Sequence, residues 1–297
     1  MMNSNFNALK KISWNSVSLK IPEYWEIDSL DNFHLLLGEE GVPKVEIKWS
    51  DLPNKFTLEK FFKKFIVVSE KQLNIKIHER SLPKYFSHPD ANFEFFFFLW
   101  ESNSATGRGT LIFCNHCKKL TMIRFFSNLD IKVDSIPAQV LYSFIDHPIS
   151  DIVNWNIFDL SFSTPREFKL IGYDFQPGGY TMRFKQKRIC LTIFSWGPAL
   201  FLLSKKNLEA FAMQKLPELK GVVSPGTCMR GDYLEWCFQG GLSNYLKKIP
   251  LLNNYSMLTV FRIIHDRQNN RLLGFFINFP ENYKYDLMKL LVDSDEK

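Results

Sequence analysis

The stretch "FEFFFFLW" (Phe93 to Trp100) is the part of the sequence that decides the fold. Successive side chains of a β-strand point to opposite faces of its sheet, so each face of this strand carries large apolar side chains. A strand that is apolar on both faces is typically buried on both. The stretch therefore predicts a central strand covered on both sides, and with it a three-layer α/β/α arrangement for this half of the chain.

The segments around this strand predict helices and a hairpin. Before it, "TLEKFFKKFIVVSEK" begins at Thr57 and places apolar residues three and four apart, which is helical spacing with a hydroxyl residue at the N-cap. After it, "TLIFCNHCKKLTMIRFF" (residues 110–126) reads as two strands joined by a tight turn. The segment "DSIPAQVLYSFI" (residues 134–145) then predicts a second helix.

The second half of the chain repeats this order. Near its start "FDLSFSTPREFKL" (residues 158–170) resembles "VSLKIPEYWEI" (residues 17–27), because each is an alternating strand followed by a proline and, three residues later, an aromatic residue. The matching helix, hairpin and final helix are predicted from Ser204, over 257–279 and over 281–292. We therefore predict an α+β fold class: two tandem antiparallel-sheet sandwiches with helices packed on the sheets, residues 1–148 and 149–297, duplicated as a pseudo-dimer.

This order of elements resembles the Mog1/PsbP-like α/β/α sandwich superfamily. The resemblance covers each half once and depends on Pro22 with Trp25 and on Pro165 with Phe168. It implies a non-enzymatic binding or assembly role, because that superfamily holds binding and assembly proteins. It transfers no functional residue to this chain.

Composition limits the compartment and the partners. The chain has 297 residues, is 45% hydrophobic and carries a net charge of +6 without a dense basic run, so we expect no dedicated nucleic-acid binding. The N-terminal residues lack the apolar region of a signal peptide, and the longest apolar runs are too short to span a membrane. Five cysteines at uneven spacing argue against a disulfide framework. These observations predict a cytoplasmic protein.

The turn Cys114-Asn115-His116-Cys117 has three interpretations. Cys114, His116 and Cys117 are potential zinc ligands, but a structural zinc site needs four, so at least one ligand must come from elsewhere. Alternatively the two thiols form a redox pair, although such pairs usually open a helix and this one leads into a strand. The third interpretation is an ordinary hairpin in which Cys114 is a small apolar residue. Apart from zinc we expect no cofactor.

Common catalytic motifs are absent from the sequence. It contains neither a phosphate-binding glycine loop nor a dinucleotide fingerprint, and it lacks the H-E-x-x-H and G-x-S-x-G patterns. An enzyme whose site is assembled from scattered residues, such as a cysteine and a histidine, stays open as a weaker alternative.

Two surfaces are predicted to bind a protein partner. Arg183, Lys185 and Lys187 alternate along one strand and would form a basic face, unless they are simply the solvated face of an edge strand. The irregular segment 240–256 is too apolar for a free loop, and its contact candidates are Tyr245, Ile249, Leu252 and Tyr255. We therefore expect a non-catalytic adaptor or assembly protein that acts through these surfaces and a groove between the domains.

Overall fold

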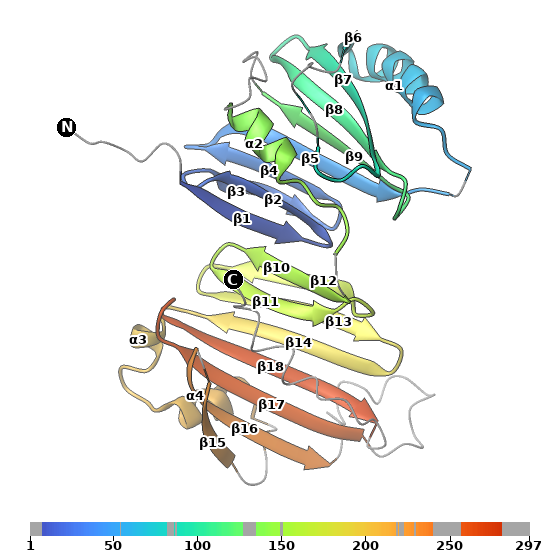
Figure 1. Ribbon diagram of the computed structural model, residues 1–297. Helices are drawn as coiled ribbons and strands as arrows, with labels where there is room; N and C mark the ends of the chain where they lie inside the picture. Colours follow the sequence, from blue (N-terminus) through green and yellow to red (C-terminus); the bar gives the residue numbers. More distant parts are fainter. Residues whose placement is uncertain are drawn as a thin grey trace, which may run out of the picture. The chain divides into compact units, whose positions relative to one another are not determined.

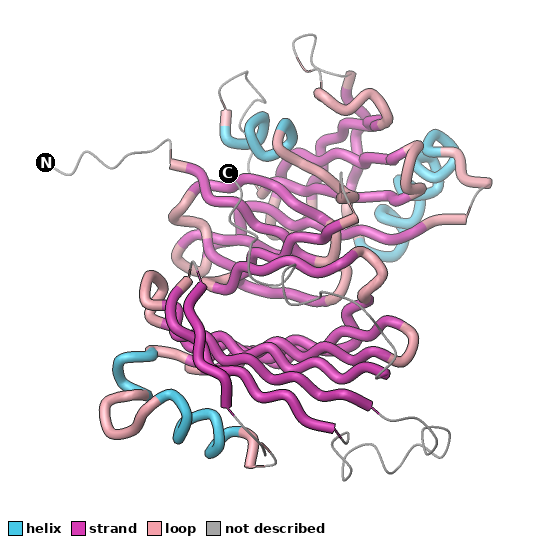
Figure 2. The backbone as a smooth tube through the Cα atoms, turned by 60° about the horizontal axis from the view of Figure 1, so that its bottom comes forward, coloured by secondary structure: helices cyan, strands magenta, loops and turns pink. Residues whose placement is uncertain are grey.

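The computed structural model describes residues 8–280, except 54, 82–85, 87, 127–134, 149–150, 218, 220–222, 229 and 240–256. The chain divides into two compact units, Met1–Ile149 with Asn154–Phe158, and Ser150–Val153 with Asp159–Lys297. Within the described part, strands far outnumber helices, and every strand pairing is antiparallel. Figure 2 shows how little of the backbone is helical.

The first unit contains most of its strands in one seven-stranded sheet with the order β3-β4-β5-β9-β8-β7-β6. The hairpin β1–β2 belongs to a separate sheet, and α2 contacts β2 (Figure 1). The elements are β1 (Leu9–Trp14), β2 (Val17–Pro22), β3 (Glu26–Asp31), β4 (His34–Glu39), β5 (Val42–Asp51), α1 (Leu58–Leu73), β6 (Lys76–Arg80), β7 (Phe93–Glu101), β8 (Thr106–Cys114), β9 (Lys119–Phe125) and α2 (Ile136–Tyr142).

The second unit has a seven-stranded sheet with the order β12-β13-β14-β18-β17-β16-β15. This is the order of the first sheet with each strand number raised by nine, so the two sheets have the same topology. The elements are β10 (Ile152–Ile157, shared with the first unit), β11 (Leu160–Pro165), β12 (Lys169–Gln176), β13 (Gly179–Gln186), β14 (Ile189–Trp196), α3 (Ala199–Leu202), α4 (Leu208–Lys215), β15 (Val223–Cys228), β16 (Gly231–Gln239), β17 (Met257–Asp266) and β18 (Arg271–Pro280).

The predicted α+β fold class is wrong, because the described chain is dominated by antiparallel sheets. Eighteen strands stand against four helices there, and α1, with 16 residues, is the one helix longer than eight. Short helices cannot form the continuous layers that an α/β/α sandwich needs. The helix predicted over 281–292 lies outside the described residues.

The strand β7 also differs from its prediction. It lies next to the edge strand β6 rather than at the centre of the sheet. Both faces are nevertheless covered: Phe98 packs against Phe62 and Phe65 of α1, and Phe97 contacts Phe86 on the other side. One helix and a loop segment therefore provide the covering that the sequence suggested would come from two helical layers.

The helices α1 and α4 differ in how well the sequence predicts their first residue. Thr57 is the N-cap of α1, as predicted, but its side chain makes no capping hydrogen bond. The prediction of Ser204 as the start of α4 is wrong, since the Ser204 hydroxyl donates to Phe201 O and so belongs to the end of α3. Asn207 is the N-cap of α4, and its side chain accepts a hydrogen bond from the Ala210 amide at 2.8 Å.

A buried ion-pair cluster crosses the first sheet. Glu46 on β5 lies directly opposite Arg124 on β9, accepts its Nε–H at 2.8 Å, and is also 2.7 Å from Lys48 Nζ. Burial alone raises the pKa of Glu46, but the hydrogen bonds and charges of Lys48 and Arg124 hold that pKa below its usual value. The Arg124 guanidinium also lies over the Trp100 ring, so it both pairs with the Glu46 carboxylate and packs against an aromatic side chain.

Candidate metal centre

The turn between β8 and β9 positions the two cysteines predicted as ligands. Cys114 is the last residue of β8, and the Lys118 amide donates to Cys114 O at 2.9 Å. Lys118 adopts a left-handed conformation with φ 58°, which closes the turn and directs the chain into β9. The Cys117 amide donates to Cys114 Sγ at 3.5 Å, and the two sulfur atoms lie within 4.8 Å of each other.

The segment after α2 brings two further side chains to this turn. Ser143 ends α2, and Ile145 then forms a two-way backbone bridge with Ser18 of β2, with both N···O distances 2.8 Å. This bridge fixes the direction of the chain as it leaves the helix. The next two residues, Asp146 and His147, therefore reach the cysteine turn although they are about thirty residues away in sequence.

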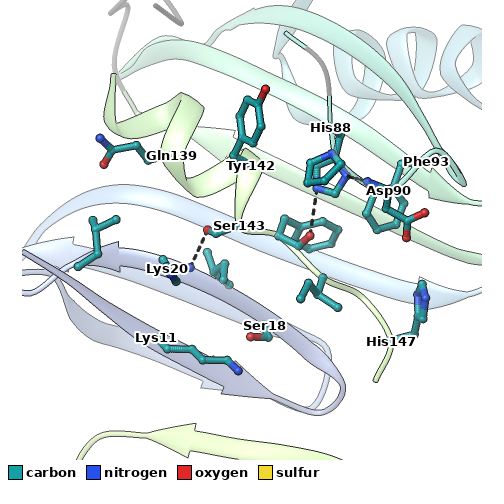
Figure 3. Close-up of a pocket in the computed structure, with 15 residues that line it drawn as sticks. Lys11, Ser18, Lys20, His88, Asp90, Phe93, Gln139, Tyr142, Ser143 and His147 are labelled. Atoms are coloured by element: carbon teal, nitrogen blue, oxygen red, sulfur yellow. Dashed lines mark hydrogen bonds between the residues drawn. The ribbon is translucent and has the colours of Figure 1, made fainter. Parts of the chain in front are cut away.

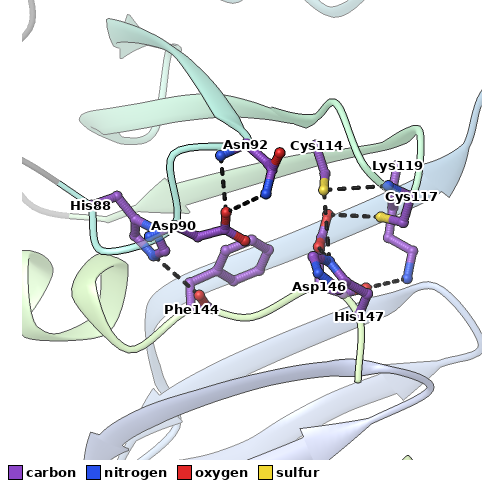
Figure 4. Close-up of polar contacts among 9 residues, drawn as sticks. All are labelled: His88, Asp90, Asn92, Cys114, Cys117, Lys119, Phe144, Asp146 and His147. Carbon is purple, nitrogen blue, oxygen red and sulfur yellow. Dashed lines mark hydrogen bonds and ion pairs between the residues drawn. The ribbon is translucent and has the colours of Figure 1, made fainter. Parts of the chain in front are cut away.

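Four potential metal ligands meet at this point. One donor atom each from Cys114, Cys117, Asp146 and His147 lies within 4.8 Å of the others, and the Cys114 and Asp146 side chains are fully buried. Asp146 Oδ2 accepts from the Cys117 thiol at 3.4 Å, and His147 Nδ1 lies 3.6 Å from Cys114 Sγ (Figure 4). Ligands of a tetrahedral zinc ion lie about 3.3–3.8 Å apart, so the most distant donors would approach by about 1 Å, while His147 Nδ1 and Asp146 Oδ1, now 2.5 Å apart, would separate.

The predicted ligand His116 lies outside this set of four. Its side chain is exposed, and its ring centre is 5.0 Å from that of His147. Asp146 and His147 are not among the ligands predicted from the sequence, because they lie about thirty residues from the cysteines and no local spacing links the two pairs. The sequence does contain one indication of these two ligands: a carboxylate and an imidazole stand side by side directly after the predicted helix 134–145.

The ionisation of the two thiols is asymmetric. The hydrogen bond from Cys117 lowers the pKa of Cys114 to about 7; burial opposes this effect, and the backbone amides of Cys117 and His116 support it. The Cys114 sulfur in turn raises the pKa of the Cys117 thiol far above its usual value, and burial and Asp146 act in the same direction. Cys114 is therefore the thiol of the pair that ionises first, and Cys117 keeps its proton.

A buried ammonium group balances the charge of this cluster. Lys119 is 7% exposed, and its Nζ donates to the backbone oxygen of Asp146 at 2.6 Å. Two thiolates and one carboxylate carry three negative charges, and a divalent ion with one ammonium supplies three positive charges. Buried charges are tolerated when they are compensated nearby. Lys119 thus places one compensating positive charge beside this group of acidic side chains.

The geometry does not fit a cysteine–histidine catalytic pair. A nucleophile activated in this way needs one ring nitrogen for the thiol and the other for the orienting carboxylate. Here a single nitrogen, His147 Nδ1, lies 2.5 Å from Asp146 Oδ1 and 3.6 Å from Cys114 Sγ. The ring cannot relay a proton between those two groups. The side chains converge on one point, as metal ligands do.

The corresponding turn in the second unit has different chemistry. It connects β17 to β18, and Asn270 takes the same left-handed conformation as Lys118, with φ 52°. There the Asn269 amide donates to Asp266 Oδ1 at 3.1 Å, and Asp266 pairs with the buried Arg230. The hairpin therefore forms without cysteine. The cysteines are a special property of the first unit, and the turn itself does not require them.

The other predicted contact residues lie apart from this centre. Arg183 and Lys185 are exposed on β13, which pairs with β12 and β14 and is therefore not an edge strand. Lys187 lies in the turn after β13 with φ 50°, so it does not extend their face. Tyr245, Ile249, Leu252 and Tyr255 lie outside the described residues.

A half-buried histidine, His88, fixes the segment beside this cluster. Asp90 donates its backbone N–H to His88 Nδ1 at 3.0 Å, so Nε2 carries the proton and donates to Phe144 O at 3.2 Å. Both ring nitrogens are thus used by the neutral form. His88 also packs edge-on against Phe93, with ring centres 4.7 Å apart. It holds the loop before β7 against the end of α2.

This arrangement predicts a loss of stability in acid. Burial lowers the pKa of His88, so the unfolded chain takes up a proton first. The contribution of His88 to stability is present above about pH 6.5, the pKa of an unperturbed histidine, and is lost as the pH falls below it. Unfolding by urea at pH 7.5 and 5.5 measures the effect. The variant His88→Gln should show a smaller pH dependence, and an identical dependence in both proteins would contradict this role.

Comparisons with known proteins do not identify a family. No protein-family model matches the chain, and no curated protein matches it. The solved structure of immunity protein TplEi of T6SS from Pseudomonas aeruginosa is 12% identical, with 98% of this chain and 97% of that chain covered and a TM-score of 0.33. A likeness at that level carries no conclusion about function. The resemblance to Mog1/PsbP-like proteins stays a prediction.

Proposed function

We propose that the first unit binds one zinc ion through Cys114, Cys117, Asp146 and His147, and that the metal has a structural role. The observation that carries the proposal is the convergence of these four donors from two separate segments. Thiolate and imidazole ligands favour zinc over magnesium or calcium, which prefer oxygen ligands only. Four protein ligands complete a tetrahedral site and leave no position for a substrate, which supports a non-catalytic role.

The bound ion would fasten the end of α2 to the β8–β9 turn. Asp146 and His147 follow directly after Ile145, so the metal would add to the backbone bridge between Ile145 and Ser18. Binding would also release the proton of Cys117, because metal ligation requires the thiolate. Zinc affinity is therefore expected to fall as the pH is lowered from 8 to 6.

Metal analysis of the purified full-length protein tests this proposal. We expect about one zinc per chain after purification, loss of the metal on treatment with a strong chelator, and recovery of the original unfolding temperature when zinc is restored. Cobalt is the spectroscopic probe, because a tetrahedral cobalt–thiolate site absorbs visibly while an oxygen-ligated site does not. Sub-stoichiometric metal together with unchanged unfolding after chelation would overturn the proposal. A finding of iron instead would correct the metal but keep the ligands.

A thiol-redox role has less support than metal binding. The Cys114 sulfur is fully buried, and the pair leads into the strand β9 rather than a helix. A redox pair that reacts with another protein needs an accessible thiolate. Free thiol ligands persist in reducing compartments, and all five cysteines are free, so we also propose a cytoplasmic location.

Protein binding remains the proposed role of the whole chain. Among the described residues, no helix combines the length and apolar character needed to span a bilayer. Arg183 and Lys185 offer an exposed basic pair on β13, which suits an acidic protein surface. Capture of partners from a native extract by the wild type and by an Arg183→Gln/Lys185→Gln variant tests this role. A partner retained equally by both proteins would remove this face from the proposal.

A further inference from the structure

The first unit contains a cavity of about 800 Å³ beside the proposed metal centre, with which it shares His147. It is bounded by the β1–β2 hairpin, by the end of α2 and by the segment around His88 to Phe93 (Figure 3). Its volume falls in the range of sites that bind small organic molecules.

Most of the wall is apolar. Phe93, Phe144 and Ile145 line the cavity between the metal segment and the helix end, and Leu9 lines it from β1. Tyr142 stands at the rim with 46% of its surface exposed, which is unusual for a large ring next to an apolar wall. The cavity therefore offers contact area to a ligand with an apolar body.

The hairpin side of the cavity is positively charged. Lys11 and Lys20 both line it, and they are direct cross-strand partners in the β1–β2 register. Like charges in that position repel each other and destabilise a hairpin. Both side chains are exposed, and within the described part of the chain neither forms an ion pair with a carboxylate. An anion placed between the two ammonium groups would remove this repulsion.

The opposite side of the cavity is less suited to an anion. Asp90 lies there, and its carboxylate already accepts hydrogen bonds from the Asn92 amide and side chain at 2.9 and 2.8 Å. Both nitrogens of His88 are occupied by backbone groups. Figure 3 shows Asp90 and His88 across the cavity from Lys11 and Lys20. A ligand would thus be oriented with its charged end toward the hairpin.

We propose that this cavity binds a small amphipathic organic anion. Its anionic group lies against Lys11 and Lys20, and its apolar body extends toward Tyr142 and Phe93. The ligand class is one negative group, such as a carboxylate or sulfonate, on an aromatic or aliphatic body. The cavity and the proposed metal centre share one residue, His147, but the proposal needs no bound metal because the charged contacts come from Lys11 and Lys20.

Two fluorescent probes with related ring systems test the proposal on the full-length protein. Anilinonaphthalenesulfonate is an anion, and phenylnaphthylamine has the same aromatic groups without the sulfonate. We expect saturable binding of the anionic probe at one site per chain, and binding of the neutral probe that is at least fivefold weaker. The variants Lys11→Gln and Lys20→Gln should each weaken the anionic probe about three- to tenfold and leave the neutral probe unchanged.

Two controls separate this result from general surface effects. Lys10→Gln removes an equal charge from the same strand, but Lys10 does not line the cavity, so it should leave both probes unchanged. Tyr142→Ser should weaken both probes, because it removes part of the apolar wall. Circular dichroism of every variant checks that the fold is kept. Equal affinity for the two probes, an equal effect of Lys10→Gln, or no saturable binding of either probe would overturn the proposal.

Discussion

The variant His147→Ala is expected to purify without zinc, whereas His116→Ala keeps its metal. The two residues are of the same type and their rings are neighbours, but only His147 has its nitrogen among the four converging donors. Loss of a ligand should weaken zinc binding at least about 100-fold, since even partners of ligands cost 10- to 100-fold. At a zinc concentration of 100 times the wild-type dissociation constant, a 100-fold loss of affinity corresponds to about 2.3 kcal/mol of lost stability.

Metal content and thermal unfolding measure this result directly. A loss of that size should lower the unfolding temperature of the first unit by roughly 5–10 °C. Cys117→Ser should behave like His147→Ala, and Cys237→Ser is the matched control because Cys237 lies on β16 of the second unit. If His116→Ala lost the metal and His147→Ala retained it, the ligand set predicted from the sequence would replace the one proposed here.

Removal of Arg124 is expected to have the second large effect. Arg124→Leu leaves Glu46 buried, at 6% exposure, without its main partner, although Lys48 and His34 remain near it. Breaking a buried ion pair by removing one partner typically costs about 3–5 kcal/mol, and because Lys48 stays beside Glu46 we expect a loss near the lower end. The double variant Glu46→Leu/Arg124→Leu removes both charges and should be more stable than Arg124→Leu alone, because no buried carboxylate is left and Lys48 is half exposed to solvent.

Urea unfolding of the three proteins provides this measurement, with the transition slope as a check on the denatured state. Arg267→Leu is the control, since the Arg267–Asp232 pair is well exposed and such pairs contribute about 0–1 kcal/mol. If Arg124→Leu cost no more than Arg267→Leu, the buried cluster would have no special role in stability.

Strands with strong alternation of apolar and polar residues could be predicted from the sequence, but the predominance of strands over helices could not. The hairpin around Cys114 to Cys117 was visible because two apolar runs flank a polar tetrapeptide. The short, polar strand Glu26–Asp31 was not, because its side chains are mostly exposed and carry little alternation. Helical spacing over 204–216 predicts a helix that begins at Ser204, earlier than α4. In the structure the Ser204 hydroxyl bonds to α3, and Asn207 caps α4 instead.

Half of the metal centre was accessible to sequence reasoning and half was not. Two cysteines three residues apart can be recognised in the sequence as potential ligands, because the turn that brings them together is local. Asp146 and His147 reach the same point through the pairing of Ile145 with Ser18, which depends on the tertiary structure. No spacing rule links a residue at the end of a helix to a hairpin tip thirty residues earlier.

The charge of the buried Lys119 would influence which ion the proposed centre accepts. The two thiolates, the carboxylate and the ammonium group together carry a net charge of −2, which a doubly charged ion would neutralise. A monovalent copper ion would leave one negative charge uncompensated, and a trivalent iron ion would leave one positive charge. Valence would thus be selected by a residue that does not touch the metal. Lys119→Met should shift the preference of the centre toward trivalent ions, because it removes that one balancing charge.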